Sequence, residues 1–272
     1  MKTRIISAAI LLPVFLLILL ALPKLVAVIL FGLMSAVAAY ELLVGTGYVK
    51  HPRLVAYAMV MAFLTALWSY FGCDHTAALI GVWAFAALLF VEMMHSHIKV
   101  RFEKVCACFA AGIVVPYLFT SMVRIHCVEG TGRFFIMIPL IMAFLSDTGA
   151  YFAGKFLGSH KLAPVISPNK TVEGAVGGIL GAIVGMMIYG LVLKFAFGFE
   201  VNFVFAMIYG VLGSVTGMFG DLCFSVIKRQ TGIKDYGNLI PGHGGILDRF
   251  DSMIFVGPLA QILLTLIPVA VK

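Results

Sequence analysis

Nine long apolar segments decide what this sequence can fold into. A helix needs about 20 apolar residues to cross the hydrocarbon core of a bilayer, and each segment has roughly that length. A water-soluble fold is excluded, since 62% of the 272 residues are hydrophobic and only 11% are charged, whereas soluble domains have about 25% charged residues. We therefore expect an all-α polytopic membrane protein with about nine transmembrane helices. The segments are Ile5–Leu22, Leu25–Val44, Leu54–Phe71, Thr76–Met94, Val105–Val123, Phe134–Gly154, Glu173–Phe197, Val201–Phe224 and Met253–Val271.

The charged residues are concentrated on one side of the predicted membrane. If the nine segments alternate in direction, fourteen of the 19 lysine and arginine residues fall on the side of the N-terminus. Positively charged loops stay in the cytoplasm, so we expect a cytoplasmic N-terminus and a C-terminus outside. Nine of the 12 acidic residues fall on the cytoplasmic side too. Both charge signs on one face are expected where chemistry takes place there, whereas transporters place ionisable residues near the midplane of the bilayer.

The last predicted cytoplasmic loop and its flanks carry one group of chemically versatile residues. An acid within an apolar helix is costly unless it is paired or binds a cation, and Asp221 is such an acid. Asp248 and Asp251 are three residues apart and would face the same way if the ninth helix began near them. The three carboxylates are hard oxygen ligands of the kind that Mg²⁺ prefers. Spacing places the following residues on one face of the eighth helix: Asp221, Ser225, Lys228 and Arg229.

A glycine-rich turn in the same segment adds a feature of anion sites. The sequence Gly242-His-Gly-Gly245 lets backbone N–H groups approach an anion, and Lys234 and Arg249 are near it in the sequence. A cytoplasmic loop with satisfied ion pairs explains any one of these residues as well. Carboxylates, cations and glycines within one short segment are together what a metal–phosphate site requires.

A second group of candidate residues lies around the seventh segment. Asp147 is an acid within the sixth apolar segment, which makes it a functional candidate. We expect Ser167 or Asn169 to cap the seventh helix, with Lys170 at its start. A helix N-terminus with a lysine and hydroxyl groups binds phosphate, although ordinary capping explains the loop alone equally well. Within the seventh helix, glycines at intervals of four residues predict close packing against a neighbouring helix.

These segments resemble a known family. The run Ser225–Asp251 is similar to the signature of the phosphatidate cytidylyltransferases, also called CDP-diacylglycerol synthases. The segment Asp147–Tyr151 and the loop Ser167–Gly174 extend the resemblance over the C-terminal half, and Tyr40-Glu41-Leu42 matches in the N-terminal half. Val165 stands where we expect a basic residue in many members, which puts one phosphate contact in doubt.

The resemblance implies a nucleotidyltransferase of phospholipid biosynthesis that converts CTP and phosphatidate into CDP-diacylglycerol and pyrophosphate with Mg²⁺. The phosphatidate phosphate would attack the α-phosphorus of CTP in line, so positioning and charge neutralisation carry the catalysis. The implied catalytic residues are Asp221, Asp248, Lys228 and Arg229, and the implied metal ligands are Asp221, Asp248 and Asp251. The implied substrate-binding residues are Ser225, Lys234, His243, Arg249, Ser167, Asn169, Lys170 and Asp147.

The resemblance also places the protein in the cell membrane, that is, the inner or cytoplasmic membrane, with its active site facing the cytoplasm. We describe the chain as one integral membrane unit, with N-terminal membrane helices in residues 1–104 and helices carrying the catalytic loops in residues 105–272. Topology and a phosphate site explain the net charge of +7, so we expect membrane lipids and no nucleic acid as partners. The sequence is also compatible with a second bound cation and with assembly into a homodimer.

Two other classes of function stay open. The first is a different CTP-dependent lipid-phosphate enzyme, such as a lipid kinase. A CDP-alcohol phosphotransferase is less suitable, because the sequence lacks the Asp-Gly-x2-Ala-Arg motif of that family. The second is a polytopic transporter, which predicts acidic residues near the midplane and two related halves.

Overall fold

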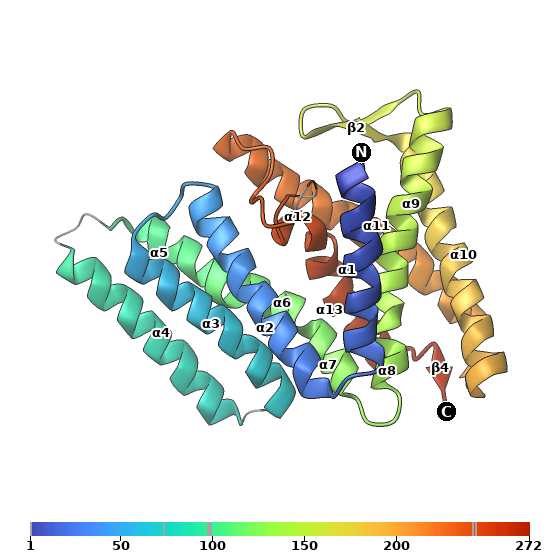
Figure 1. Ribbon diagram of the computed structural model, residues 1–272, viewed down its shortest axis with the longest axis horizontal. Coiled ribbons are helices and arrows are strands. Elements are labelled where there is room, and N and C mark those ends of the chain that lie inside the picture. Colours follow the sequence, from blue (N-terminus) through green and yellow to red (C-terminus); the bar gives the residue numbers. More distant parts are fainter. Residues whose placement is uncertain (1, 73, 97–99, 241, 243) are drawn as a thin grey trace. The chain divides into compact units, whose positions relative to one another are not determined.

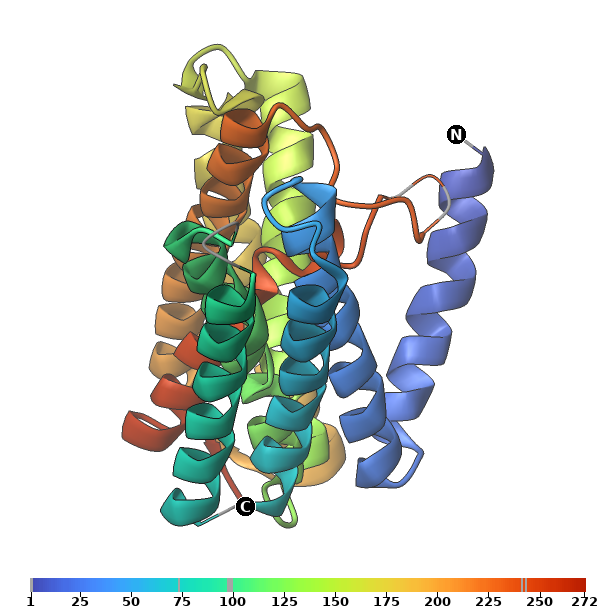
Figure 2. The same ribbon diagram turned by 90° about the vertical axis from the view of Figure 1, so that its left-hand side faces the viewer.

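The computed structural model describes residues 2–72, 74–96, 100–240, 242 and 244–272, and most of them are helical (Figures 1 and 2). Within this part of the chain, seven helices are long and apolar enough to cross a membrane, and shorter apolar helices span Ala9–Leu20 and Met253–Leu266. The expected all-α polytopic membrane protein is confirmed, and nine crossings stay a prediction. The seven long helices are Lys24–Gly45, Pro52–Phe71, His75–His95, Phe102–Cys127, Gly132–Leu157, Val172–Phe197 and Phe203–Thr231.

The chain folds into two compact units. The first consists of Met1–Cys127 and Gln230–Phe250, and the second consists of Val128–Arg229 and Asp251–Lys272. The first boundary between these units lies after Cys127; the division after residue 104 described two parts of one integral membrane unit and stays a prediction. The loop around residues 230–250 belongs with the N-terminal helices, although it comes late in the sequence.

The first unit is a group of packed helices interrupted by π-helical turns. Its elements are α1 (Lys2–Leu20), α2 (Lys24–Tyr40), η1 (Glu41–Gly45), α3 (Pro52–Phe71), α4 (His75–His95), α5 (Phe102–Phe109), η2 (Ala110–Val114), α6 (Val115–Phe119), α7 (Ser121–Cys127) and α12 (Leu247–Phe250). Helix α3 lies between α2 and α4 (Figure 1). Its residues Leu54 and Ala58 are buried with Phe85 and Leu89 of α4. Gly112 of η2 allows close packing, because a Cβ there would lie 3.3 Å from the Cα of Ala58.

Large apolar side chains are exposed on the outer surface of α4. Leu79, Ile80 and Trp83 are 68%, 60% and 70% exposed. A continuous apolar surface of this kind is unfavourable in water and is expected where a helix faces lipid tails. Helix α4 therefore has the surface of a membrane-spanning helix as well as the length of one.

The second unit is centred on a tight pair of helices, α9 and α10. Its elements are α8 (Gly132–Phe135), α9 (Met137–Leu157), β1 (Lys161–Ala163), β2 (Ser167–Thr171), α10 (Val172–Phe197), β3 (Glu200–Val201), α11 (Phe203–Thr231, up to Arg229 in this unit), α13 (Met253–Leu266) and β4 (Ala270–Val271). A Cβ at Gly149 would overlap with the carbonyl of Gly177, and a Cβ at Gly181 would lie 2.6 Å from the carbonyl of Leu145. The glycine spacing of the seventh segment therefore predicted helix packing correctly.

Short antiparallel strand pairs stand at the two ends of α10. At one end β1 pairs with β2 to form a hairpin between α9 and α10, and at the other end β3 pairs with β4 near the C-terminus (Figure 1). Because the hairpin is extended up to Thr171, neither Ser167 nor Asn169 caps α10, and that prediction was wrong. The cap is Thr171, whose Oγ1 accepts a hydrogen bond from the N–H of Gly174 at 3.1 Å.

The last two apolar helices differ from their expected ends. Helix α11 continues to Thr231 instead of ending at Phe224. Helix α13 begins at Met253 and ends at Leu266, because Pro268 keeps the residue before it out of the helical conformation. Asp248 lies in the separate short helix α12. The condition for Asp248 and Asp251 to share one helix face is therefore not met.

Candidate functional site

Asp221 is the centre of a charged cluster in the second unit. Its Oδ2 forms an ion pair with the Nζ of Lys170, which stands at the end of β2. The hydroxyl of Ser225, one turn further along α11, donates a hydrogen bond to Asp221 Oδ1 at 3.3 Å. Lys170 is 23% exposed and Asp221 33% exposed, so both charges are partly withdrawn from solvent and remain accessible to a ligand.

A second contact joins α11 to the hairpin. The Nε of Arg229 donates a hydrogen bond to the carbonyl of Ile166 at 3.0 Å. Asp221, Ser225 and Arg229 follow one another at intervals of four residues, so they lie on one face of α11, as the sequence predicted. The structure thus brings the loop around Lys170 together with this part of the C-terminal signature.

Asp251 is the most deeply buried acid of the second unit, with 8% exposure. Its Oδ1 accepts a hydrogen bond from the N–H of Ser252 at 2.8 Å. Burial raises the pKa of the Asp251 carboxyl, and the nearby carboxylates of Asp221 and Asp147 raise it further, while Lys228 lowers it. The side chains of Asp251, Asp221, Asp147 and Lys228 and the N–H of Ser252 therefore interact within one unit. The negative charges of the three carboxylates repel each other.

Asp248 holds the glycine-rich turn in the first unit. Its Oδ2 accepts hydrogen bonds from the N–H of Tyr236 at 2.8 Å and from the N–H of Gly245 at 3.0 Å. By accepting hydrogen bonds from both N–H groups, the Asp248 carboxylate joins Tyr236 to Gly245. The predicted catalytic Asp248 is therefore buried and organises the turn.

A further carboxylate, that of Glu41, contacts the same segment. Glu41 lies at the start of η1 and is 3% exposed. Its Oε1 accepts a hydrogen bond from the N–H of Ile246 at 3.0 Å, and its Oε2 accepts one from the N–H of Leu247 at 2.8 Å. Sequence reasoning did not select Glu41 as a site residue. The signal that could have identified it is the presence of an acid at the end of a long apolar segment.

An open cavity of about 420 Å³ lies against this loop in the first unit. That volume is within the range of small-molecule sites, about 300–1,000 Å³. Lys234 and Arg249, both predicted to bind substrate, line the cavity, and the N–H of Ile240 donates to the carbonyl of Gly244 across the turn at 2.9 Å. The described lining residues are Lys234, Asp235, Asn238, Ile240, Gly242, Gly244 and Arg249.

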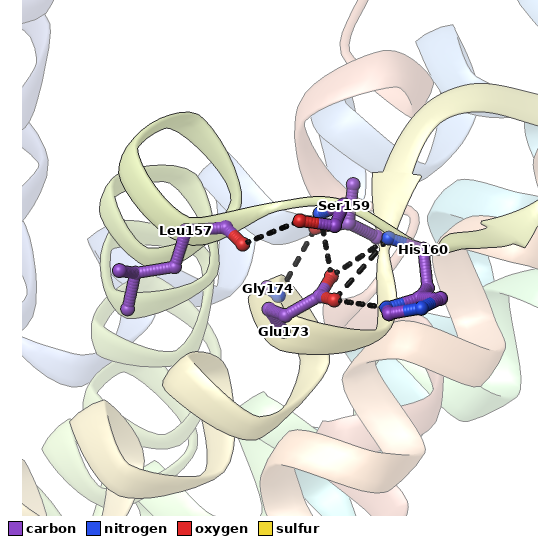
Figure 3. Close-up of polar contacts among 6 residues, drawn as sticks. Leu157, Ser159, His160, Glu173 and Gly174 are labelled. Carbon is purple, nitrogen blue, oxygen red and sulfur yellow. Dashed lines mark hydrogen bonds and ion pairs between the residues drawn. The ribbon is translucent and has the colours of Figure 1, made fainter.

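Another cluster fixes the loop between α9 and β1 (Figure 3). The carboxylate of Glu173 accepts hydrogen bonds from the N–H groups of Ser159 and His160 at 3.1 and 3.2 Å. The Nδ1 of His160 lies 2.6 Å from Glu173 Oε1. Glu173 is in the first turn of α10, so it anchors the start of the hairpin whose far end carries Lys170. Sequence reasoning missed this role, because the contact joins residues on either side of the hairpin.

The predicted site residues fall into two sets, one in each unit. Asp147 is exposed on α9, Ser167 is half-buried on β2 and Asn169 is exposed on β2. His243 lies outside the described residues. The set in the first unit is Lys234, Asp248 and Arg249. The set in the second unit is Asp147, Ser167, Asn169, Lys170, Asp221, Ser225, Lys228, Arg229 and Asp251.

The carboxylates of the second unit have the chemistry of a Mg²⁺ site. Mg²⁺ is usually bound by one or two protein carboxylates together with substrate phosphates and water. Asp221 and Asp251 supply two; burial raises the pKa of Asp251 most, the carboxylate of Asp221 raises it further, and a cation would relieve this repulsion. Among the described residues no group of three His, Cys, Asp or Glu side chains is arranged to hold a metal alone. The residues therefore fit a metal that is completed by substrate phosphates.

Comparison with known proteins identifies the class to which this fold and site belong. The sequence pattern of the cytidylyltransferase family matches residues 2–267, so this membrane protein is a nucleotidyltransferase. The chain belongs to the cytidylyltransferase family.

Individual relatives agree with this membership. The chain is similar to a phosphatidate cytidylyltransferase of Bacillus subtilis (strain 168), with 36% identity over 270 residues that cover 98% of each protein. It is also similar to a phosphatidate cytidylyltransferase of Staphylococcus aureus (strain COL), with 38% identity over 181 residues, which cover 65% of this chain and 67% of the relative.

Proposed function

We propose that the protein transfers the cytidylyl group of CTP to phosphatidate, giving CDP-diacylglycerol and pyrophosphate. The observation that carries this assignment is the similarity to a phosphatidate cytidylyltransferase over 98% of both chains. The groups around Asp221 support it: Lys170 and Ser225 contact its carboxylate, and Arg229 and the buried Asp251 belong to the same unit. Groups of these kinds bind phosphates and a divalent cation.

In this reaction a phosphate oxygen of phosphatidate attacks the α-phosphorus of CTP. A bond forms between these two atoms while the bond from the α-phosphorus to the β-bridging oxygen breaks, and pyrophosphate leaves with the electron pair. A phosphate monoester has its second pKa near about 6, so the attacking oxygen is ionised near neutral pH and needs no strong general base. The protein therefore has to position two polyanions and balance their charge.

The second unit provides cationic and hydroxyl groups for this task. Lys228 and Arg229 of α11 would bind phosphates, with Ser225 as a hydroxyl donor. Lys170 would bind a phosphate group that lies beside Asp221, since the side chains of Lys170 and Asp221 are in contact. Asn169, Ser167 and Asp147 stay predicted substrate contacts on the hairpin and on α9.

We propose that Asp221 and Asp251 hold Mg²⁺. When bound, the cation would neutralise phosphate charge and polarise the α-phosphoryl group. Asp248 stays a predicted catalytic residue and ligand, although two backbone N–H groups already occupy its Oδ2. His243 and a second cation also stay predictions.

We further propose nine membrane crossings, with the N-terminus and the active site on the cytoplasmic side of the cell membrane. CTP is a cytosolic substrate, and phosphatidate reaches the site from the bilayer. The pairing of β3 with β4 supports an even number of crossings between them, because paired strands lie on the same side. Helices α11 and α13 supply two such crossings.

An assay with the purified full-length protein tests the reaction. In detergent micelles with phosphatidate and labelled CTP, we expect CDP-diacylglycerol and pyrophosphate in equal amounts, and no turnover in excess EDTA until Mg²⁺ is restored. Asp221→Asn should lower kcat by about a hundredfold or more, because it removes charge where the metal and phosphates meet. The matched control is Glu103→Gln, an exposed acid paired with Arg101, which should keep wild-type turnover. An inactive wild-type protein would contradict the proposed function, and an Asp221→Asn protein as active as wild type would contradict the role of Asp221 in it.

A further inference from the structure

Glu41 is a buried acid that has no role in the reaction as described so far. Its two carboxylate oxygens accept hydrogen bonds from the backbone N–H groups of Ile246 and Leu247, more than 200 residues along the chain. No described Lys, Arg or His forms an ion pair with it. Burial of a carboxylate is costly unless hydrogen bonds compensate for it, and here one loop supplies those bonds.

Two glycines of that loop leave space for the Glu41 side chain. A Cβ at Gly237 or at Gly245 would overlap with the Glu41 carboxylate. Neither glycine has a positive φ angle, so space is what these positions require. The carboxylate therefore lies between two separate stretches of the loop and contacts both.

The same loop forms the wall of the cavity. The described lining of the cavity includes Lys234 and Arg249 of this loop, and Glu41 contacts the loop at Gly237 and at residues 245–247. Asp248 joins Tyr236 to Gly245 from within the loop. Glu41 is thus a side chain from outside the loop that joins it to η1, where Gly45 also lies close to the carbonyl of Tyr236.

We propose that Glu41 is a positioning residue for the transfer reaction. Its carboxylate holds the loop in the conformation in which Lys234 and Arg249 face a substrate in the cavity. This role rests on the proposed function, since it assigns the cavity to one of the two substrates. Glu41 acts through the backbone of Ile246 and Leu247 and does not touch the substrate.

The test measures the KM of both substrates in Glu41→Gln. Glutamine keeps the size of the side chain but turns one acceptor into an NH2 donor, which then faces a backbone N–H. We expect the KM of one substrate to rise about tenfold or more, as is typical when a supporting residue is lost, and the other KM to stay unchanged. Lys234→Ala identifies the cavity substrate, because it should raise the same KM. In the double variant the two effects should combine to less than their product, since both act through the loop.

The matched control is Glu92→Gln in the same unit. Glu92 is 6% exposed and lies 3.5 Å from both His51 and Arg53, so this change also removes a buried charge and should lower thermal stability without raising either KM. If Glu41→Gln does not fold, Gly237→Ala replaces it, because its Cβ displaces the carboxylate without removing it.

A folded Glu41→Gln or Gly237→Ala protein with wild-type KM values for both substrates would overturn the positioning role. The same holds if Glu41→Gln and Lys234→Ala raise the KM of different substrates. An inactive wild-type protein would instead count against the proposed function, so the two failures are distinguishable.

Discussion

Charge at the candidate site is balanced residue by residue. The carboxylate of Asp221 has a lysine and a serine as partners, whereas Asp251 is more deeply buried and is held by its own neighbouring N–H. Two acids in the same cluster therefore have different surroundings, and burial raises the pKa of the Asp251 carboxyl. Environment-dependent proton affinity of this kind is common where metals or phosphates bind.

Asp251 should make the stability of the metal-free protein depend on pH. Its pKa is raised in the folded state above the ordinary value of about 3.9, so the folded protein keeps a proton that the unfolded chain has lost. This contribution to stability is complete below about pH 3.9 and declines as the pH rises through the folded-state pKa. In EDTA, wild type should therefore lose stability relative to Asp251→Asn over that interval. Thermal unfolding of both proteins across the pH range measures the difference, and parallel curves would contradict it.

The sequence predicted which residues share a helix face better than it predicted contacts between distant residues. Spacing along one helix was enough to align Asp221, Ser225 and Arg229, because an α-helix fixes which residues share a face. It was not enough for Glu41, whose partners are distant in the sequence, or for Thr171, which caps α10 because the preceding loop is a hairpin. Contacts between distant segments depend on the tertiary fold, which local patterns do not encode.

At the scale of elements, the close packing of α9 and α10 supports the charged cluster. Lys170 stands in β2, two residues before α10 begins, and Asp147 lies on α9, so the distance between these helices affects two predicted site residues. Small residues set that distance, because the backbone of one helix lies against the backbone of the other. Packing between α9 and α10 thereby controls the geometry of the charged cluster.

Gly149→Ala should destabilise the protein. The added Cβ would overlap with the carbonyl of Gly177, which is backbone and has little freedom to move, and we expect a cost of about 1–3 kcal/mol. Gly81→Ala is the matched control, since its Cβ would lie 4.0 Å from the nearest atom, the Cε of Met61. The control should be neutral or more stable by up to about 1 kcal/mol, because alanine favours helix. Thermal unfolding in detergent compares them, and equal midpoints would show that the helices do not pack this closely.

At the scale of the whole molecule, the apolar segments and their charged ends define how the chain lies in a membrane. Seven of the nine expected segments correspond to described helices long and apolar enough to cross a membrane, and the sequence could predict them because length and hydropathy are local properties. Their exact ends were less visible, since Pro268 shortens α13 and polar residues extend α11 to Thr231. The division into two units was not visible, because it depends on contacts of residues 230–250 with the N-terminal helices.

A reporter enzyme that is active only outside the cytoplasm tests the number of crossings. Joined after Lys272, it should be active if the chain crosses the membrane nine times. The expectation follows from the excess of positive charge on the side of the N-terminus. A reporter inserted after Arg101, in a predicted cytoplasmic loop, is the matched control and should give the opposite signal. A cytoplasmic signal at Lys272 would contradict nine crossings.

The contact of Glu41 with Ile246 and Leu247 also has a consequence for biosynthesis. The two halves of this contact are separated by 205 and 206 residues, and a ribosome adds about 5–20 residues per second. The carboxylate is therefore made about 10 to 40 s before its hydrogen-bond donors, by that rate. During this interval the N-terminal helices enter the membrane with an acid that lacks its native partners. The first unit completes its fold only after Ile246 and Leu247 have been made.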